Sequence, residues 1–182
     1  MIKKLLFLFS IIMFFSCGNE NDDIYKTKSK EYASKSGNFI IKFPTKPNYS
    51  FIENQIGLDK FQINLIRSTL GINKIFSLEY TDYPEYLLKS KTDEQLFDQV
   101  IENYTFKMAE SFKLKEQNSI EQYGIKGRYF VFRLKQSAID QGIFGHIEGK
   151  VFRKGLRIYI VTYMGVNDKH TDEFINSFRF LK

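Results

Sequence analysis

The spacing of apolar residues changes along this chain, and the change limits the folds that it can adopt. Before Pro84, apolar side chains recur at every second position, as in residues 38–43 and 74–83, which indicates half-buried β-strands. Residues 92–108 instead show a period of about 3.6, which indicates an amphipathic helix. The period of two then returns, until residues 168–178 again show the helical spacing. The sequence therefore predicts an α+β fold in which a mostly antiparallel sheet carries at least two helices.

Individual strands are predicted from alternation and from the turn residues between them. Glycines at positions 57 and 155 separate consecutive apolar runs, as in tight hairpins. In residues 156–164 both alternating faces are apolar, which is typical of a central strand covered on both sides. The other strands are expected at residues 38–43, 49–56, 60–66, 74–83, 112–122, 125–134 and 143–152. The early strands are expected to turn inward Phe39, Ile41, Phe43, Phe61, Ile63, Leu65, Phe76, Leu78 and Tyr80.

Two helices carry their own boundary signals. Thr92 and Gln95 have the spacing of a capping box, in which each side chain binds a backbone N–H at the start of the helix. The apolar stripe that follows consists of Phe97, Val100, Ile101, Tyr104 and Met108. Asn167 or Asp168 is expected to cap the last helix. The side chains expected to face inward from that helix are Phe174, Ile175 and Phe178.

The first 17 residues have the features of an export signal. A basic start precedes an apolar run over residues 5–15, and Ser16 is followed by Cys17, the single cysteine. A cysteine directly after the small residue resembles a bacterial lipoprotein signal. We therefore expect residues 1–16 to be removed and acyl chains on Cys17 to hold the protein in a lipid bilayer. The alternative, a transmembrane anchor, would need about 17 to 25 apolar residues.

Residues 17–37 are expected to form a flexible tether between the anchor and a single domain at residues 38–182. This segment is polar and lacks the apolar periodicity needed for packing, although a helical turn near residues 25–33 is an alternative. The acidic residues within positions 19–23 resemble an export tag that sends some lipoproteins to the cell surface. A plain solvated linker is the alternative. The expected location is the bacterial outer membrane, on its periplasmic or its surface face.

Four short segments of the expected domain resemble a known family. They are residues 38–44 (NFIIKFP), 78–84 (LEYTDYP), 155–159 (GLRIY) and 174–178 (FINSF). With the order of the elements, they resemble the PsbP/Mog1/DcrB-like domains, which are α/β/α sandwiches and recur in small bacterial lipoproteins. Members include an extrinsic photosystem subunit, a nuclear-transport regulator and envelope proteins. The resemblance therefore implies a binding or assembly scaffold without a shared catalytic activity.

The sequence lacks the patterns of common catalytic, metal and cofactor sites. It has no nucleophile elbow, Walker-type glycine loop or dinucleotide fingerprint. His146 and His170 have no ligand-type spacing; His146 is expected on a solvated strand face with Glu148 and Lys150, and His170 at the start of the last helix, as an exposed loop histidine. Basic and acidic residues alternate, so the net charge of +6 does not form the basic patch of a nucleic-acid binder. We expect no enzyme, cofactor, metal or nucleic-acid partner; a hydrolase with an unusual site is the weakest alternative.

Two surfaces are candidates for binding a protein partner. Tyr83, Pro84 and Tyr86 follow a strand end, where exposed aromatic rings beside a rigid proline would make good anchors; core and turn packing is the alternative. Cations could also gather at one end of paired strands and attract an acidic partner or lipid head group. These cations are Arg128, Arg133, Arg153, Lys154 and Arg157.

These observations predict a membrane-anchored, non-catalytic interaction or assembly module of the cell envelope. Its membrane contact would be the lipid bound through the acyl chains on Cys17. The alternative is a small-ligand-binding module with an apolar, aromatic-lined cleft between the sheet and a helix.

Overall fold

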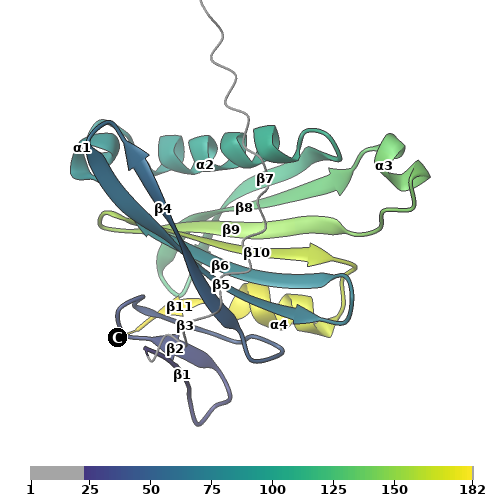
Figure 1. Ribbon diagram of the computed structural model, residues 1–182, viewed down its shortest axis with the longest axis horizontal. Coiled ribbons are helices and arrows are strands. Elements are labelled where there is room, and N and C mark those ends of the chain that lie inside the picture. The colour runs from purple at the N-terminus through teal and green to yellow at the C-terminus, as the bar shows by residue number, and fades with distance from the viewer. Residues whose placement is uncertain (1–22, 182) are drawn as a thin grey trace, which may run out of the picture.

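The computed structural model describes residues 23–181, which form three layers around a central sheet (Figure 1). The predicted signal segment and Cys17 lie outside the described residues. The strands are β1 (Ile24–Lys26), β2 (Tyr32–Ser34), β3 (Phe39–Ile41), β4 (Asn48–Ile56), β5 (Asp59–Leu70), β6 (Lys74–Asp82), β7 (Phe112–Gln122), β8 (Ile125–Leu134), β9 (His146–Lys154), β10 (Arg157–Gly165) and β11 (Arg179–Phe180). The helices are α1 (Glu85–Leu88), α2 (Asp93–Met108), α3 (Gln136–Asp140) and α4 (Lys169–Ser177).

Seven strands make up the central sheet, in the order β4-β5-β6-β10-β9-β8-β7, and every neighbouring pair is antiparallel. Helix α2 covers one face of this sheet. Helix α4 covers the other face together with a four-stranded sheet, β1-β2-β3-β11 (Figure 1). The predicted α+β sandwich is confirmed, with the small sheet as an added part of one outer layer.

The hydrophobic core consists of two clusters on opposite faces of the central sheet. Strand β10 contributes to both: Ile158 and Ile160 pack towards α2, whereas Tyr159 and Tyr163 pack towards α4 and the small sheet. Because β10 lies fourth among the seven strands, the prediction of a central strand covered on both faces is confirmed. The early-strand residues Phe39, Ile41, Phe43, Phe76, Leu78 and Tyr80 are buried as expected.

The helix boundary signals also act as predicted. The Thr92 hydroxyl accepts from the backbone N–H of Gln95, and the Gln95 side chain accepts from the backbone N–H of Thr92. Asp168 caps α4 by accepting from the backbone N–H groups of His170 and Thr171. His170 therefore lies in the first turn of α4 and not in a loop.

The expectation of a flexible tether is wrong from Asp23 onward. Strand β1 pairs with β2, and β2 pairs with β3, so this polar segment completes the small sheet. All three residues of β2 are buried. Each of these strands has only three residues, so the segment is too short to show an alternating pattern in the sequence. Neighbouring strands and the core order it, and the alternative helical turn does not form.

The expectation that His146 and Lys150 lie on a solvated face is also wrong. Their exposed fractions are 4% and 7%. The Lys150 ammonium group donates to the side-chain oxygens of Gln122 (2.6 Å) and Asn176 (2.7 Å), and the latter residue lies on α4. The ring of Tyr163 lies 6.0 Å from that of His146. Helix α4 thus covers this polar stretch of β9, and burial lowers the pKa of Lys150.

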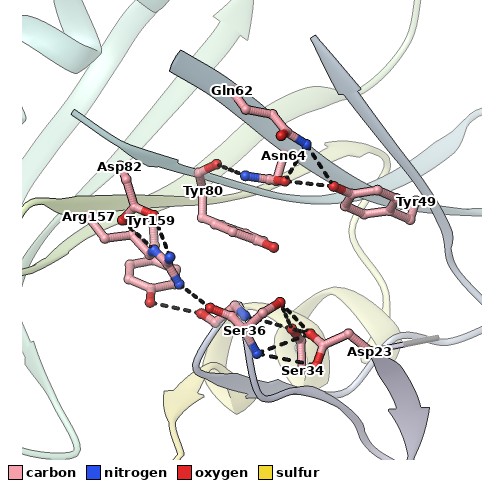
Figure 2. Close-up of polar contacts among 11 residues, drawn as sticks. Asp23, Ser34, Ser36, Tyr49, Gln62, Asn64, Tyr80, Asp82, Arg157 and Tyr159 are labelled. Carbon is pink, nitrogen blue, oxygen red and sulfur yellow. Dashed lines mark hydrogen bonds and ion pairs between the residues drawn. The ribbon is translucent and has the colours of Figure 1, made fainter. Parts of the chain in front are cut away.

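A polar network centred on Arg157 fastens the small sheet to the central sheet (Figure 2). The guanidinium pairs with the Asp82 carboxylate at 2.7 Å (Nε to Oδ1) and donates to the backbone carbonyl of Ser36 at 2.5 Å. It also lies 4.9 Å from the centre of the Tyr80 ring. One side chain therefore joins β6, β10 and the turn that follows β2.

Asp23 extends this network at the start of the described chain (Figure 2). Its carboxylate accepts from the hydroxyl groups of Ser34 and Ser36 and from the backbone N–H groups of Lys35 and Ser36. Burial would raise the pKa of Asp23, but these hydrogen bonds outweigh it and lower the pKa. The carboxylate therefore holds β1 against the turn that follows β2.

Arg157→Lys is expected to loosen the small sheet, because lysine keeps the charge but loses the forked contact with Asp82 and Ser36. The expected cost is about 1 to 2 kcal/mol. Hydrogen–deuterium exchange should show faster exchange of the β2 amides, with little change in β9. Arg153→Lys is the matched control, because Arg153 pairs with Asp93 outside this network. Unchanged exchange in β2 would show that the network does not hold the small sheet.

Candidate functional site

Helix α2 leaves the β4–β5 hairpin partly uncovered on its own side of the central sheet. Its buried side chains pack mainly on β8, β9 and β10. The β5 residues that were expected to be in the core, Phe61, Ile63 and Leu65, are therefore only half-buried. Ile66, on the opposite face of β5, is fully buried instead. An apolar strip thus remains beside the helix.

The tip of this hairpin carries exposed apolar side chains. Gly57 has a φ of +63°, a left-handed conformation that suits glycine in a tight turn. The next residue, Leu58, is 97% exposed, and Ile56 is also exposed. Turn positions usually carry small polar residues, so a leucine here is unusual.

Helix α1 lies beside this tip (Figure 1) and adds an aromatic ring. Tyr86 is 54% exposed, and its hydroxyl lies close to the carboxylate of Asp59, the residue after Leu58. The Asp59 carboxylate raises the pKa of Tyr86, so this ring lies next to the hairpin. We call Ile56, Leu58 and Tyr86 the hairpin-tip surface.

The other two residues that were predicted with Tyr86 lie at the inner border of this surface. The Tyr83 ring is half-buried and packs 5.5 Å from the ring of Phe61. Burial raises the pKa of Tyr83, and the nearby carboxylate of Glu79 adds to the effect. Pro84 is the N-cap residue of α1 and fixes where the helix begins. Tyr83 and Pro84 therefore support the position of Tyr86, and their side chains are less exposed than that of Tyr86.

A cleft between α2 and the sheet matches the place expected for a ligand, but it is small. Its volume is about 80 Å³, and Ile63, Tyr83 and Val100 are among its lining residues. The Tyr104 hydroxyl spans it and donates to the carboxylate of Glu79 at 2.8 Å. Burial raises the pKa of Tyr104 well above its usual value, so this hydroxyl keeps its proton. Sites for small organic ligands usually measure about 300 to 1,000 Å³.

A wider groove lies between the end of α2 and β7. Its volume is about 600 Å³, and it is open along its length. Ile101, Phe106 and Leu114 supply apolar lining, whereas Asp98 and Glu102 make one border acidic. Phe106 is 85% exposed, so its ring remains mostly in solvent although it lines the groove.

The predicted cation cluster is largely neutralised within the chain. Arg128 forms ion pairs with Glu94 and Asp98, and Arg153 pairs with Asp93 at 2.8 Å. Arg157 is held by Asp82 in the network described above. The ammonium group of Lys154 lies 4.8 Å from the centre of the Phe180 ring. Arg133 is exposed on β8. These contacts do not create one basic surface for an acidic partner.

Neither a metal cluster nor a membrane-spanning helix occurs within the described residues. Between residues 23 and 181, no three His, Cys, Asp or Glu side chains are grouped so that they could hold a metal ion. Over the same range, no helix has the length and apolar character needed to cross a bilayer.

Comparison with known proteins identifies the fold. No protein-family model matches the chain, and no curated protein matches its sequence. Its structure is similar to the solution structure of cyanobacterial PsbP (CyanoP) from Synechocystis sp. PCC 6803. The two share 11% sequence identity and a TM-score of 0.53, over 91% of this chain and 98% of the other. The chain therefore has the fold of a PsbP-like domain, as the resemblance in its sequence predicted.

Proposed function

We propose that this protein is a non-catalytic interaction module of a bacterial cell envelope, which is anchored by lipid at Cys17 and docks a partner protein through the hairpin-tip surface. The observation that carries the proposal is the exposure of Leu58, in the β4–β5 turn, beside the exposed Tyr86 on α1. The proposed location is the outer membrane. The PsbP-like fold is compatible with this role, although the fold by itself assigns no partner.

The physical character of the hairpin-tip surface favours a protein partner. Exposed apolar residues that stand alone are ordinary on protein surfaces, but clustered ones indicate contact sites. Tyrosine is enriched among the residues that dominate binding energy, because it buries a large ring and keeps a hydroxyl for hydrogen bonding.

The predicted alternative, a ligand-binding cleft lined by aromatic residues, has weaker support. The cleft between α2 and the sheet has room for water-sized molecules, and Tyr104 spans it to reach Glu79. The groove between α2 and β7 is larger but open, so a small ligand there would stay largely in water. Neither space favours a small organic ligand as strongly as the hairpin tip favours a protein.

Crosslinking of the full-length protein in its native cells tests the proposal. The double variant Leu58→Ser/Tyr86→Ala is expected to reduce recovery of the specific crosslinked partner about tenfold or more, because central anchors typically contribute at least about 2 kcal/mol each. Phe144→Ala is the matched control, since Phe144 is also well exposed, at 72%, but lies before β9, away from the tip. Recovery of the same species at the same yield from both variants would refute docking at the tip.

The membrane anchor is tested separately in the same cells. Cys17→Ser is expected to move the protein from the membrane fraction to the soluble fraction, because it removes the acyl chains that give stable anchoring. If the variant stays with the membrane, lipid at Cys17 is not the anchor. That result would leave the docking test unaffected.

A further inference from the structure

The two edges of the central sheet are protected to very different degrees. Strand β7, at one edge, has a bulge between Leu114 and Glu116, where its register with β8 shifts. It also carries four charged side chains among its 11 residues, at Lys113, Lys115, Glu116 and Glu121. Bulges and charges are the usual means by which a sheet edge avoids pairing with another chain.

Strand β4, at the opposite edge, has no bulge and little charge. Its nine residues pair with β5 in one continuous register, from Asn48 opposite Arg67 to Ile56 opposite Asp59. It contains no proline, no lysine and one charged residue, Glu53. On its outer side, no strand within residues 23–181 pairs with it. A long, regular edge of this kind is a template for strand pairing.

The side chains of β4 are compatible with a second copy of the same strand. We propose that β4 pairs antiparallel with β4 of a second copy of this chain, about a twofold axis at Ile52. This register sets Ile52 opposite its own counterpart and Phe51 opposite Glu53. The one acidic residue therefore never faces its like, which would destabilise a cross-strand pair. Ile52 is 55% exposed in the single chain and becomes covered at the axis.

The contrast between the two edges also sets the size of the assembly. A twofold contact uses the same edge on both copies, so pairing through β4 leaves no free β4 edge. Within residues 23–181, the central-sheet edges that remain are the two β7 strands, which their bulges and charges protect. The assembly is therefore a dimer, in which one continuous sheet extends across both copies. The two hairpin tips lie at opposite ends of the paired β4 strands.

Disulfide trapping tests the register of this dimer. In full-length protein with Cys17→Ser, Ile52→Cys places two thiols opposite each other at the axis. Directly opposed antiparallel residues lie about 4.5 to 5.5 Å apart between Cα atoms, within the range that a disulfide spans. Mild oxidation should therefore link two chains. Asn118→Cys is the control, on the exposed and protected β7 strand. Equal crosslinking at the two positions, or none at Ile52→Cys, would overturn the proposed register.

Sedimentation equilibrium tests the assembly itself. The full-length chain, in a non-ionic detergent that keeps its apolar N-terminal segment in solution, is expected to show twice the mass of one chain. Ile52→Lys should restore the single-chain mass, because it sets like charges opposite each other at the axis. Ile72→Lys, the same substitution at an exposed turn between β5 and β6, should remain dimeric. A single-chain mass for the unsubstituted protein would refute the dimer. Leu58 and Tyr86 are unchanged in all these variants, so these experiments do not test the docking proposal.

Discussion

Phe174→Ala is expected to lower the free energy of unfolding by about 4 kcal/mol, since removing a buried phenylalanine ring typically costs about 3 to 5 kcal/mol. The Phe174 ring projects from α4 and is fully buried. Its centre lies 5.1 Å from the ring of Phe43 and 5.3 Å from the ring of Phe76. Phe43 follows the small sheet, and Phe76 belongs to the central one. The substitution therefore opens a cavity where the three parts of this layer meet.

Urea unfolding followed by circular dichroism measures this loss, a suitable probe because the chain has no tryptophan. Phe106→Ala is the matched control, because it removes the same ring from an exposed position on α2. The control is expected to change stability by no more than about 0.5 kcal/mol. Similar losses in the two variants would contradict the described packing of α4.

Stability is expected to fall as the pH rises from 10 towards 12, partly because of Tyr80. Burial raises the pKa of Tyr80 from its usual 10.0 to about 12, and the nearby Tyr49 adds to the effect. In this range the unfolded chain has lost the Tyr80 proton while the folded chain still holds it. Stability is therefore complete below pH 10 and is lost through this window. At about 1.36 kcal/mol per pKa unit, Tyr80 alone accounts for about 3 kcal/mol.

Unfolding free energies measured over a series of pH values test this expectation. Burial also raises the pKa values of Tyr104, Tyr159 and Tyr163, so these residues add to the same decline. Tyr80→Phe keeps the buried ring but removes the ionisable hydroxyl. Its stability should therefore fall less steeply above pH 10 than that of the unsubstituted protein. Parallel pH profiles for the two proteins would show that the Tyr80 hydroxyl is not protected by the fold.

Much of the architecture was predictable because local patterns encode it. The two apolar faces of β10 placed it at the centre of the sheet, where both faces are covered. The capping box of Thr92 and Gln95 marked the first turn of α2, and Asp168 marked that of α4. Each signal lies within a few residues of the feature that it specifies, so one sequence is enough to recognise it.

The features that were missed depend on contacts between distant segments. Strands β1, β2 and β11 are too short for a periodic pattern and are ordered by their neighbours in the small sheet. Lys150 appeared solvated because its cover, α4, comes later in the chain. At the candidate site, Tyr86 was recognisable from the sequence, but Leu58 was not. The hairpin and α1 become neighbours only when β5 and β6 pair. The one local signal was an apolar residue directly after the turn glycine.

The position of Asp23 also determines how the domain would respond to mechanical force. A load applied through the chain upstream of Asp23 enters at β1, an outer strand of the small sheet. The first bonds to bear it are those from Asp23 to Ser34 and Ser36, followed by the three pairs between β1 and β2. Because the four-stranded sheet is separate from the central one, β1 can peel away while the seven-stranded sheet stays closed. The small sheet would then unfold first and lengthen the chain before the core comes under strain.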